Sequence, residues 1–411
     1  MKKNLLPLLF VALFLMVLSS CNKEKTIAAS DSNINFFSLN GKESLKKTII
    51  LSNGNIAMAG TFNQNGFVAV FDSEGTKLWY SEVGGYESDL FNDLIETSEG
   101  DILAVGTANS PSEGVTGFSD AWLVNFSAEG NVNWKTTIGV EAYSEVAVSA
   151  LETPEGDFVV TGWQTVSGAY SFVGRISKDG NFMWQRSYRI GPWHSWGKSM
   201  VLTPEGDLMV AGLCSSGGGG IDLDRNTTYL AKFNLKFGVL IDSDIYTDFV
   251  REAIYSFTIS EGGSLILQNE KDGYSWTTFI EGENLSAKVQ YAKVDFNRNL
   301  ILERKYSGIG HLNLSSTIKL DNGEYLLCGR TSEQPLEATG LKNPLATIIK
   351  IGNNGEVKWS STFGGSASSQ SALSARQKDD KWFVYSANRD PETSTKSYAI
   401  YKTDNLGNVL K

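Results

Sequence analysis

The sequence predicts an all-β fold built from repeated four-stranded units, and three observations lead to this prediction. First, the stretch EGDILAVGTA from Glu99 recurs in close copies from Asn53, Glu155, Glu205 and Asn322. Second, another β-rich block follows each copy and ends in tryptophan in four of the units. Third, no helical period of apolar residues occurs after the N-terminal segment, whereas short β-rich runs recur throughout.

The repeat interval predicts the number of units. The second glycine of the motif recurs at intervals of roughly fifty to sixty residues. Asn269 and Ser386 fill two of the seven places, and glycine fills the others: Gly60, Gly106, Gly162, Gly212 and Gly329. Each unit contains four short β-rich runs separated by turn residues, and four strands repeated seven times predict a seven-bladed β-propeller.

Turn residues indicate the order of strands within a unit. SEGD, PEGD and DNGE lie between the first and second strands, and DSEG, AEGN and KDGN lie between the third and fourth. Tight hairpins need a residue that tolerates positive φ, which explains these glycines. The glycine that ends each second strand is expected to let neighbouring sheets approach closely near the axis.

Four tryptophans occupy one position of the repeat, four residues after a turn glycine: Trp79, Trp134, Trp184 and Trp359. An indole repeated at a fixed place in the fourth strand is expected to be a wedge between adjacent blades. Stacking on a ligand is the alternative explanation.

The two ends of the chain predict how the ring closes. The seventh unit stops at Lys411 before most of its fourth strand, whereas Ile34–Leu39 has no first three strands of its own. We therefore expect Ile34–Leu39 to supply the outer strand of the blade formed by about residues 370–405, because closure removes an open sheet edge.

The N-terminus reads as an export signal. Lys2 and Lys3 precede an apolar run from Leu5 to Leu18 that is too short to span a bilayer comfortably. The following LSSC, ending at Cys21, resembles the lipobox of bacterial lipoproteins, which implies cleavage before Cys21 and lipidation of its sulfur. An ordinary secretory signal is the alternative. The predicted segments are a signal peptide (1–20), a lipidated cysteine with its tether (21–32) and the propeller (33–411).

Charge and cysteine content exclude other classes. The formal net charge is −10, with scattered basic residues, so we expect no nucleic-acid partner. Besides Cys21, only Cys214 and Cys328 are present, each beside the second glycine of its own unit. Both are expected to be small buried strand residues, and this count excludes a disulfide framework.

The G-x-x-x-W ending resembles the repeats of the quinoprotein-like (PQQ-type) propeller superfamily. The fuller pattern DAWLVNFSAEGNVNW is similar to repetitive propeller proteins of Bacteroidetes. This resemblance covers nearly all of residues 33–411 and implies fold far more than activity. The adjacent cysteines of quinoprotein dehydrogenases are absent, so no quinone or other cofactor is expected.

Loop lengths predict where function lies. The 2–3 loops and the links between units share one face of a propeller, and here they vary greatly in length. On this loop face the repeat places His194 and His311 next to a series expected to ring the mouth of a central channel: Glu43, Asp89, Glu145, Ser195, Arg251, Leu312 and Ser369. Such a mixed ring suits ligand binding or acid–base chemistry; a hydrated channel rim is the alternative.

Further candidates lie on or near the same face. Four tryptophans stand outside the wedge position and suit sugar stacking or protein contacts, although packing between loops explains them equally well: Trp163, Trp193, Trp196 and Trp276. Asp222, Asp224 and Asn226 resemble the start of a calcium loop, but Thr227 replaces the required glycine, so no metal site is expected.

Two classes of function follow from these observations. The first is a non-enzymatic, lipid-anchored binding or scaffold propeller in the cell envelope of a Gram-negative bacterium, at the outer membrane. It would contact the membrane only through the lipid and engage a glycan or partner protein through its loop face. The second is a carbohydrate-active hydrolase or lyase with acids such as Asp89 and Glu145 at the channel mouth. Absence of a nucleophile elbow or phosphate loop favours the first.

Overall fold

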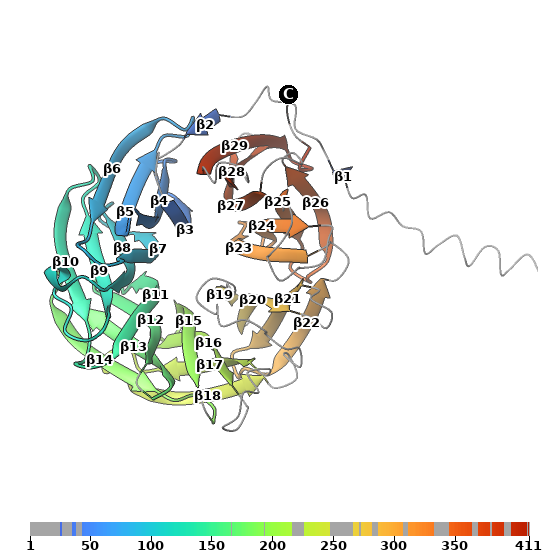
Figure 1. The fold of residues 1–411 in the computed structure, drawn as a ribbon. Helices are drawn as coiled ribbons and strands as arrows, with labels where there is room; N and C mark the ends of the chain where they lie inside the picture. Colours follow the sequence, from blue (N-terminus) through green and yellow to red (C-terminus); the bar gives the residue numbers. More distant parts are fainter. Residues whose placement is uncertain are drawn as a thin grey trace, which may run out of the picture.

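The described residues form seven antiparallel sheets arranged around an axis, as predicted for a seven-bladed propeller (Figure 1). The computed structural model describes residues 25–26, 35–37, 43–165, 167–192, 194–215, 226–246, 266–270, 273–281, 287–306, 311–332, 345–363, 369–378, 380–389, 396–408 and 410. In this part of the chain no helix has the length and hydropathy of a membrane span.

The first four blades each contain four consecutive strands. Blade 1 consists of β3 (Glu43–Ile50), β4 (Ile56–Phe62), β5 (Asn65–Phe71) and β6 (Lys77–Val83). Blade 2 consists of β7 (Leu90–Glu96), β8 (Ile102–Ala108), β9 (Asp120–Phe126) and β10 (Val132–Ile138). Blade 3 consists of β11 (Ser144–Glu152), β12 (Phe158–Thr165), β13 (Ala169–Ile176) and β14 (Phe182–Tyr188). Blade 4 consists of β15 (Ser195–Leu202), β16 (Leu208–Ser215), β17 (Asn226–Phe233) and β18 (Leu240–Tyr246).

The last three blades include the N-terminal strands. Blade 5 consists of β19 (Ile266–Glu270), β20 (Gly273–Glu281), β21 (Ala287–Asp295) and β22 (Leu300–Tyr306). Blade 6 consists of β23 (His311–Lys319), β24 (Tyr325–Ser332), β25 (Leu345–Ile351) and β26 (Val357–Phe363), with β1 (Lys25–Thr26) added to its edge. Blade 7 consists of β27 (Ser369–Lys378), β28 (Lys381–Arg389), β29 (Lys396–Asp404) and β2 (Asn35–Phe37).

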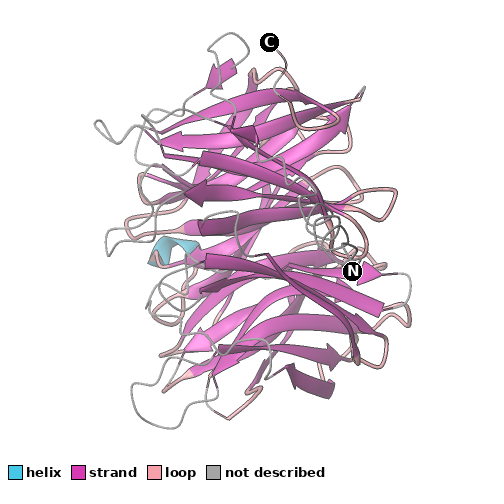
Figure 2. Ribbon diagram, turned by 90° about the vertical axis from the view of Figure 1, so that its right-hand side faces the viewer, coloured by secondary structure: helices cyan, strands magenta, loops and turns pink. Residues whose placement is uncertain are grey.

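The first strand of each blade lies nearest the axis, and the last lies at the rim (Figure 1). In the side view, the short 3₁₀-helix η2 (Pro111–Glu113) of the blade 2 loop lies on the left-hand face of the ring (Figure 2). We call this face the loop face. We call the opposite face, which carries the 1–2 and 3–4 hairpins, the turn face.

The apolar second strands are buried on both sides. In β8, Ile102 and Ala104 belong to the core shared with blade 1, whereas Leu103 and Val105 pack with Phe158 of blade 3. Because successive side chains of a strand point to opposite faces, each blade contributes to two cores. This explains why these strands are continuous apolar runs rather than alternating ones.

The turn glycines have the predicted conformation. Gly100 in the 1–2 hairpin of blade 2 has φ +86° and its amide donates to the Thr97 carbonyl at 2.9 Å. The Thr97 amide closes the same hairpin by donating to the Asp101 carbonyl at 2.8 Å. An L-residue with a Cβ is disfavoured in this left-handed region.

The second glycine of the motif acts within its own blade, which corrects the prediction of close approach between neighbouring sheets. A Cβ at Gly60 would overlap the carbonyl oxygen of Ser44, which lies in the first strand of the same sheet. The register of β3 and β4 shifts between Leu45 and Lys47, so the glycine stands opposite a β-bulge. The same shift occurs beside Gly106, Gly162, Gly212 and Gly329. A bulge pushes a carbonyl toward its partner strand, so glycine is the residue that fits.

The wedge tryptophans are confirmed. The Trp134 indole nitrogen donates to the Lys178 carbonyl of blade 3 at 3.1 Å, and a Cβ on Gly180 would lie 2.7 Å from the indole. Each wedge indole thus packs on the 3–4 turn glycine of the next blade, in the pairs Trp79–Gly130, Trp134–Gly180, Trp184–Gly238 and Trp359–Gly407.

Blade 5 departs from the predicted strand assignment. The sequence predicts that Asn269 ends the second strand and that a long loop follows over residues 270–290. Among the described strands of blade 5, β19 lies nearest the axis, where the Leu267 amide donates to Ser199 Oγ of β15 at 3.1 Å. Gly273–Glu281 forms the second strand, β20. A short apolar run fits either place in a blade, and only its pairing partners distinguish them.

The N-terminal strand β2 pairs antiparallel with β29, with Asn35 opposite Ile400 and Phe37 opposite Tyr398. This pairing is compatible with ring closure by Ile34–Leu39. Blade 7 in turn contacts blade 1 through β27 and β3, and Arg376 donates to the Gly54 carbonyl at 2.8 Å. Cys214 and Cys328 are buried free thiols on strands, as predicted.

Candidate functional site

Asp89 is fully buried at the loop-face end of blade 2. Its Oδ1 accepts from the backbone amides of Asn109 at 2.8 Å and Ser110 at 3.0 Å, and its Oδ2 accepts from the Gly85 amide at 2.8 Å. Buried polar groups need such partners. The carboxylate therefore connects, through hydrogen bonds, the segment between blades 1 and 2 with the long loop between β8 and β9.

Glu145 is buried at the equivalent place in blade 3. Gln164 Nε2 donates to Glu145 Oε1 at 2.6 Å, and the Ser187 hydroxyl donates to the side-chain oxygen Oε1 of Gln164 at 2.6 Å. Burial raises the pKa of Glu145 to about 7; the Gln164 amide opposes this rise, and the Asp120 carboxylate adds to it. At neutral pH this carboxyl is therefore partly protonated.

Ser195, the next member of the series, is buried as well. Its hydroxyl oxygen accepts from the Ser171 amide at 3.1 Å and from the Ile190 amide at 3.2 Å. In the series, Asp89, Glu145 and Ser195 are the members whose side chains the structure describes, and all three are buried. That the series rings a channel mouth stays a prediction. Asp89 and Ser195 accept hydrogen bonds from backbone amides of the segments that meet at this place. Ligand binding by Asp89 and Glu145 stays a prediction.

An aromatic and basic group of side chains surrounds the start of β15 on the loop face. Lys198 Nζ lies 4.7 Å from the centre of the Trp163 ring. His194 and Trp196 have ring centres 5.7 Å apart, and His194 Nδ1 accepts from the Ala169 amide at 3.0 Å. Three of these four residues are sequence-predicted candidates. We call these four residues the β15 cluster.

Tyr170 and Arg189 form a second aromatic–basic pair at the loop-face end of blade 3, with Tyr170 on the other side of the sheet from Trp163. The Arg189 guanidinium lies 4.8 Å from the Tyr170 ring centre and donates to the Tyr170 hydroxyl. A cation over an aromatic face is stabilised by the ring quadrupole by about 0.5–2 kcal/mol. Desolvation by the surrounding protein lowers the pKa of Lys198 to about 8. The cluster therefore offers aromatic faces beside basic groups.

Lys198 was not among the predicted residues. It is the extra residue of the β-bulge in β15, between Gly197 and Ser199, and a bulge is invisible in a repeat alignment. Its place beside Trp196 in SWGKS was the only available signal. Its contact with Trp163 depends on blades 3 and 4 packing together.

Several predicted residues lie outside the described part of the chain. These are Cys21, Trp193, Asp222, Asp224 and Arg251, and the same holds for the side chains of Trp276, His311 and Asn226. The structure does place the backbone of Trp276 in strand β20 rather than in a long loop, because residues 273–281 pair on both sides. Among the described residues, no three His, Cys, Asp or Glu side chains gather as metal ligands.

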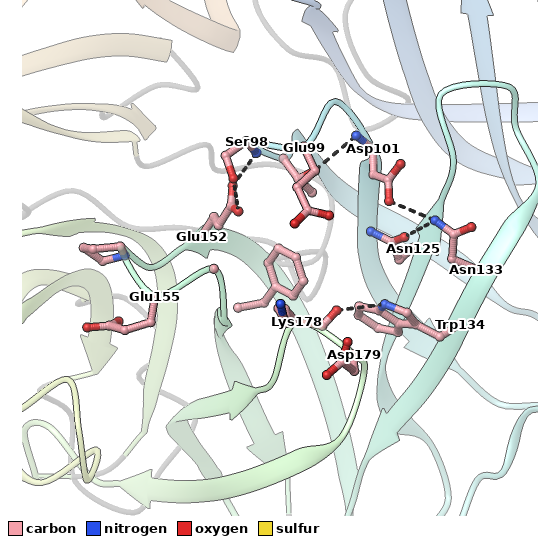
Figure 3. A pocket seen from close by; sticks show the side chains of 14 residues that line it. Ser98, Glu99, Asp101, Asn125, Asn133, Trp134, Glu152, Glu155, Lys178 and Asp179 are labelled. Atoms are coloured by element: carbon pink, nitrogen blue, oxygen red, sulfur yellow. Dashed lines mark hydrogen bonds between the residues drawn. The ribbon is translucent and has the colours of Figure 1, made fainter.

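A pocket of about 410 Å³ lies on the turn face, between blades 2 and 3 (Figure 3). Its lining includes Glu99, Asp101, Glu152, Trp134 and Lys178. The sequence predicts no site there, because the turns on this face are short and uniform. Burial, with the Glu99 carboxylate as a further cause, raises the pKa of Asp101.

Many polar side chains that line this pocket form hydrogen bonds with one another. The backbone amide and hydroxyl of Ser98 donate to Glu152 at 2.6 and 2.7 Å. Asn133 donates to Asp101 at 2.8 Å and to Asn125 at 2.7 Å (Figure 3). Ser52 and Glu96 make the same pair of bonds between blades 1 and 2. We therefore interpret the pocket as a gap beside a Ser–Glu hydrogen-bond pair that recurs between neighbouring blades.

Comparisons with known proteins support the fold. No protein-family model matches the sequence, and no curated protein matches it. Among solved structures, a PL25 polysaccharide lyase, described as an ulvan lyase bound to -[GlcA(1-4)Rha3S]-, matches with a TM-score of 0.55 at 10% identity, covering 91% of this chain and 97% of that chain. The polysaccharide lyase Uly1 matches with a TM-score of 0.50 at 9% identity, covering 93% of this chain and 94% of that chain.

At these identities the likeness establishes architecture alone. Together with the seven sheets, it defines the protein as a β-propeller.

Proposed function

We propose that the protein is a lipid-anchored, non-enzymatic propeller of the bacterial cell envelope that binds an acidic glycan at the β15 cluster. The observation that carries this proposal is the pairing of aromatic rings with cations on the loop face: Lys198 lies 4.7 Å from the Trp163 ring and Arg189 lies 4.8 Å from the Tyr170 ring. Sugar rings stack on aromatic faces, and Lys and Arg bind carboxylate or sulfate groups.

Two further facts support an acidic ligand. The chain carries a formal net charge of −10, so basic side chains that gather at one place are not explained by the overall charge. Binding of a negatively charged ligand there would explain them. In addition, one propeller of similar architecture is described as bound to a saccharide containing glucuronic acid and sulfated rhamnose. A glycan with repeated negative groups fits the cluster better than a neutral glycan or a protein partner.

A polysaccharide lyase is the second candidate, favoured by Lys198. A lysine whose pKa is lowered to about 8 is partly neutral near pH 7 and can accept a proton. The form of this alternative that relies on Asp89 and Glu145 is less favoured, because both carboxylates are buried among internal partners. A lyase would therefore use the β15 cluster.

Binding to an array of acidic and neutral polysaccharides tests the proposal. We expect the wild-type chain to bind acidic members, and Lys198→Met to weaken this binding about tenfold, equivalent to roughly 1.4 kcal/mol. Lys236→Met is the matched control, because Lys236 also lies over an aromatic ring, Phe237 at 5.3 Å, but on the turn face.

Two results would contradict this proposal. One is the absence of binding to every acidic glycan, and the other is equal loss in the two lysine variants. Ultraviolet absorbance of an unsaturated uronate product, growing with time and lost in Lys198→Met, would instead establish the lyase.

A further inference from the structure

The outer rim of blades 4 and 5 carries exposed apolar side chains at its turn-face end. Their exposed fractions are 56% for Phe237, 53% for Val239, 52% for Ile241, 41% for Phe296, 46% for Leu300 and 55% for Ile301. We call these six residues the rim patch. Phe237 and Phe296 lie in the 3–4 turns of the two blades, and the others lie next to these turns or at the start of the outermost strands.

The two halves of the rim patch are joined by contacts between the blades. Arg298, in the 3–4 turn of blade 5, pairs with Asp242 and Asp244 on β18. The Tyr246 hydroxyl also donates to the Arg298 carbonyl at 3.0 Å. The turn that carries Phe296 is therefore held against the outer strand of blade 4. In the described part of blade 3, by contrast, only Phe182 and Met183 are comparably exposed at the outer strand.

The N-terminal segment runs along the neighbouring blade. Strand β1 pairs in parallel with β26, with Lys25 opposite Ser361 and Thr26 opposite Thr362 (Figure 1). The pairing places Lys25 and Thr26 beside the second half of β26, whose first residue, at the turn-face end, is Val357. Val357 itself is 37% exposed.

The distance from this strand to the expected lipid is short. Cys21 precedes Lys25 by four residues, and an extended chain spans at most about 3.6 Å per residue, or roughly 14 Å in all. A bilayer that holds a lipid on Cys21 must therefore lie close to the outer rim of blade 6. Blade 5, which contributes half of the rim patch, is the adjacent blade.

We propose that the rim patch lies against the lipid bilayer that holds the anchor. This inference rests on the lipidation of Cys21 but not on glycan binding. Exposed apolar side chains next to an anchor enter the interfacial region of a membrane and limit how the molecule rotates about its tether. The turn-face rim of blades 4 to 6 then faces the lipid, and the β15 cluster, on the loop face, points away from it.

Site-specific fluorescence on vesicles tests this orientation. A chain that begins at residue 22 contains every described strand. An N-terminal histidine tag would hold it on phosphatidylethanolamine–phosphatidylglycerol vesicles that contain a nickel-chelating lipid. An environment-sensitive dye is attached at Ile301→Cys or, as the matched control, at Met183→Cys, which is 47% exposed on blade 3. Cys214 and Cys328 are buried and are not expected to react.

We expect a quencher on the lipid acyl chains to reduce the fluorescence at position 301 several-fold more than at position 183. Equal quenching at both positions, or none at position 301, would overturn the proposal. A dye response at position 301 that depends on protein concentration without vesicles would also overturn it, because the patch would then join two copies of the chain. Lipidation is tested separately: Cys21→Ser should release the full chain from membranes, whatever the dye reports.

Discussion

The contact between blades 2 and 3 and the contact between blades 4 and 5 use the same two backbone positions with different chemistry. Between blades 2 and 3, Trp134 packs on the turn glycine Gly180. Between blades 4 and 5, Asp242 stands at the tryptophan position and pairs with Arg298, which replaces the turn glycine. Arg298 keeps the left-handed conformation of that turn, with φ +65°.

The comparison shows that the repeat conserves a place of contact rather than a type of contact. An indole on a glycine buries apolar surface and excludes water. In the ion pairs of Arg298, both carboxylates stay substantially exposed, at 59% for Asp242 and 45% for Asp244. Exposed ion pairs contribute little to the free energy of unfolding. The contact between blades 4 and 5 should therefore be the weaker of the two.

The largest expected effect is the loss of the wedge between blades 2 and 3. Trp134→Ala should lower the free energy of unfolding by about 3 kcal/mol, the lower end of the range for large aromatic deletions, because the indole is only half-buried. Urea denaturation followed by circular dichroism measures this change.

Gly180→Ala tests the same contact by changing the glycine on which the Trp134 indole packs, and the added Cβ should destabilise the protein because it would overlap the indole. Gly156→Ala is its matched control, because both glycines have positive φ, but a Cβ at Gly156 has no atom within 4 Å. The difference between the two variants isolates the indole contact. Equal stability of the two variants, or a wild-type stability for Trp134→Ala, would show that the indole is not a wedge.

The loop-face end of the blade 2–3 contact should respond to pH through Glu145. Its pKa is raised from 4.5 to about 7, so the folded state favours the protonated carboxyl. The stabilising effect is full below about pH 4.5 and is lost as the pH rises through 7. At about 1.4 kcal/mol for each pKa unit, this loss amounts to roughly 3 kcal/mol.

Glu145→Gln keeps the size of the side chain and removes this titration. The stability difference between wild type and variant, measured by urea denaturation from pH 4 to pH 8, should therefore change in favour of the variant as the pH rises. Contributions from groups other than Glu145 that titrate in this range cancel in the difference. A difference that does not vary with pH would contradict the raised pKa.

The smallest effect comes from transferring the indole contact to blades 4 and 5. Asp242→Trp alone should destabilise by placing an indole against Arg298, and Arg298→Gly alone should leave two carboxylates without their cation. The double variant restores the tryptophan–glycine pair, so we expect a favourable coupling energy of about 1–2 kcal/mol between the two changes. A double-mutant cycle by urea denaturation at low and high salt measures it, and strictly additive effects would argue against interchangeable contacts.

Local repeats made much of the architecture predictable. The positive φ at Gly100 and Gly180 favours glycine through local conformation alone, so the hairpins are visible in the sequence. The recurrence of Trp134 and its equivalents at one strand position also predicted the wedge. Blade 5 was misassigned because Asn269 replaces the glycine on which the alignment depended, and a short apolar run fits either strand of a pair.

The sequence by itself determined the all-β class, the seven units, the turn positions and the wedge positions, because each depends on conformational preferences within a few residues. The tertiary structure decided which polar side chains are exposed and therefore able to contact a ligand. Asp89 and Glu145 look like accessible acids in the sequence, yet links between blades bury them. Lys198 and Trp163 come from different blades and meet only because the ring brings a bulge of β15 beside β12. Such contacts depend on the packing of separate sheets, which no local pattern encodes.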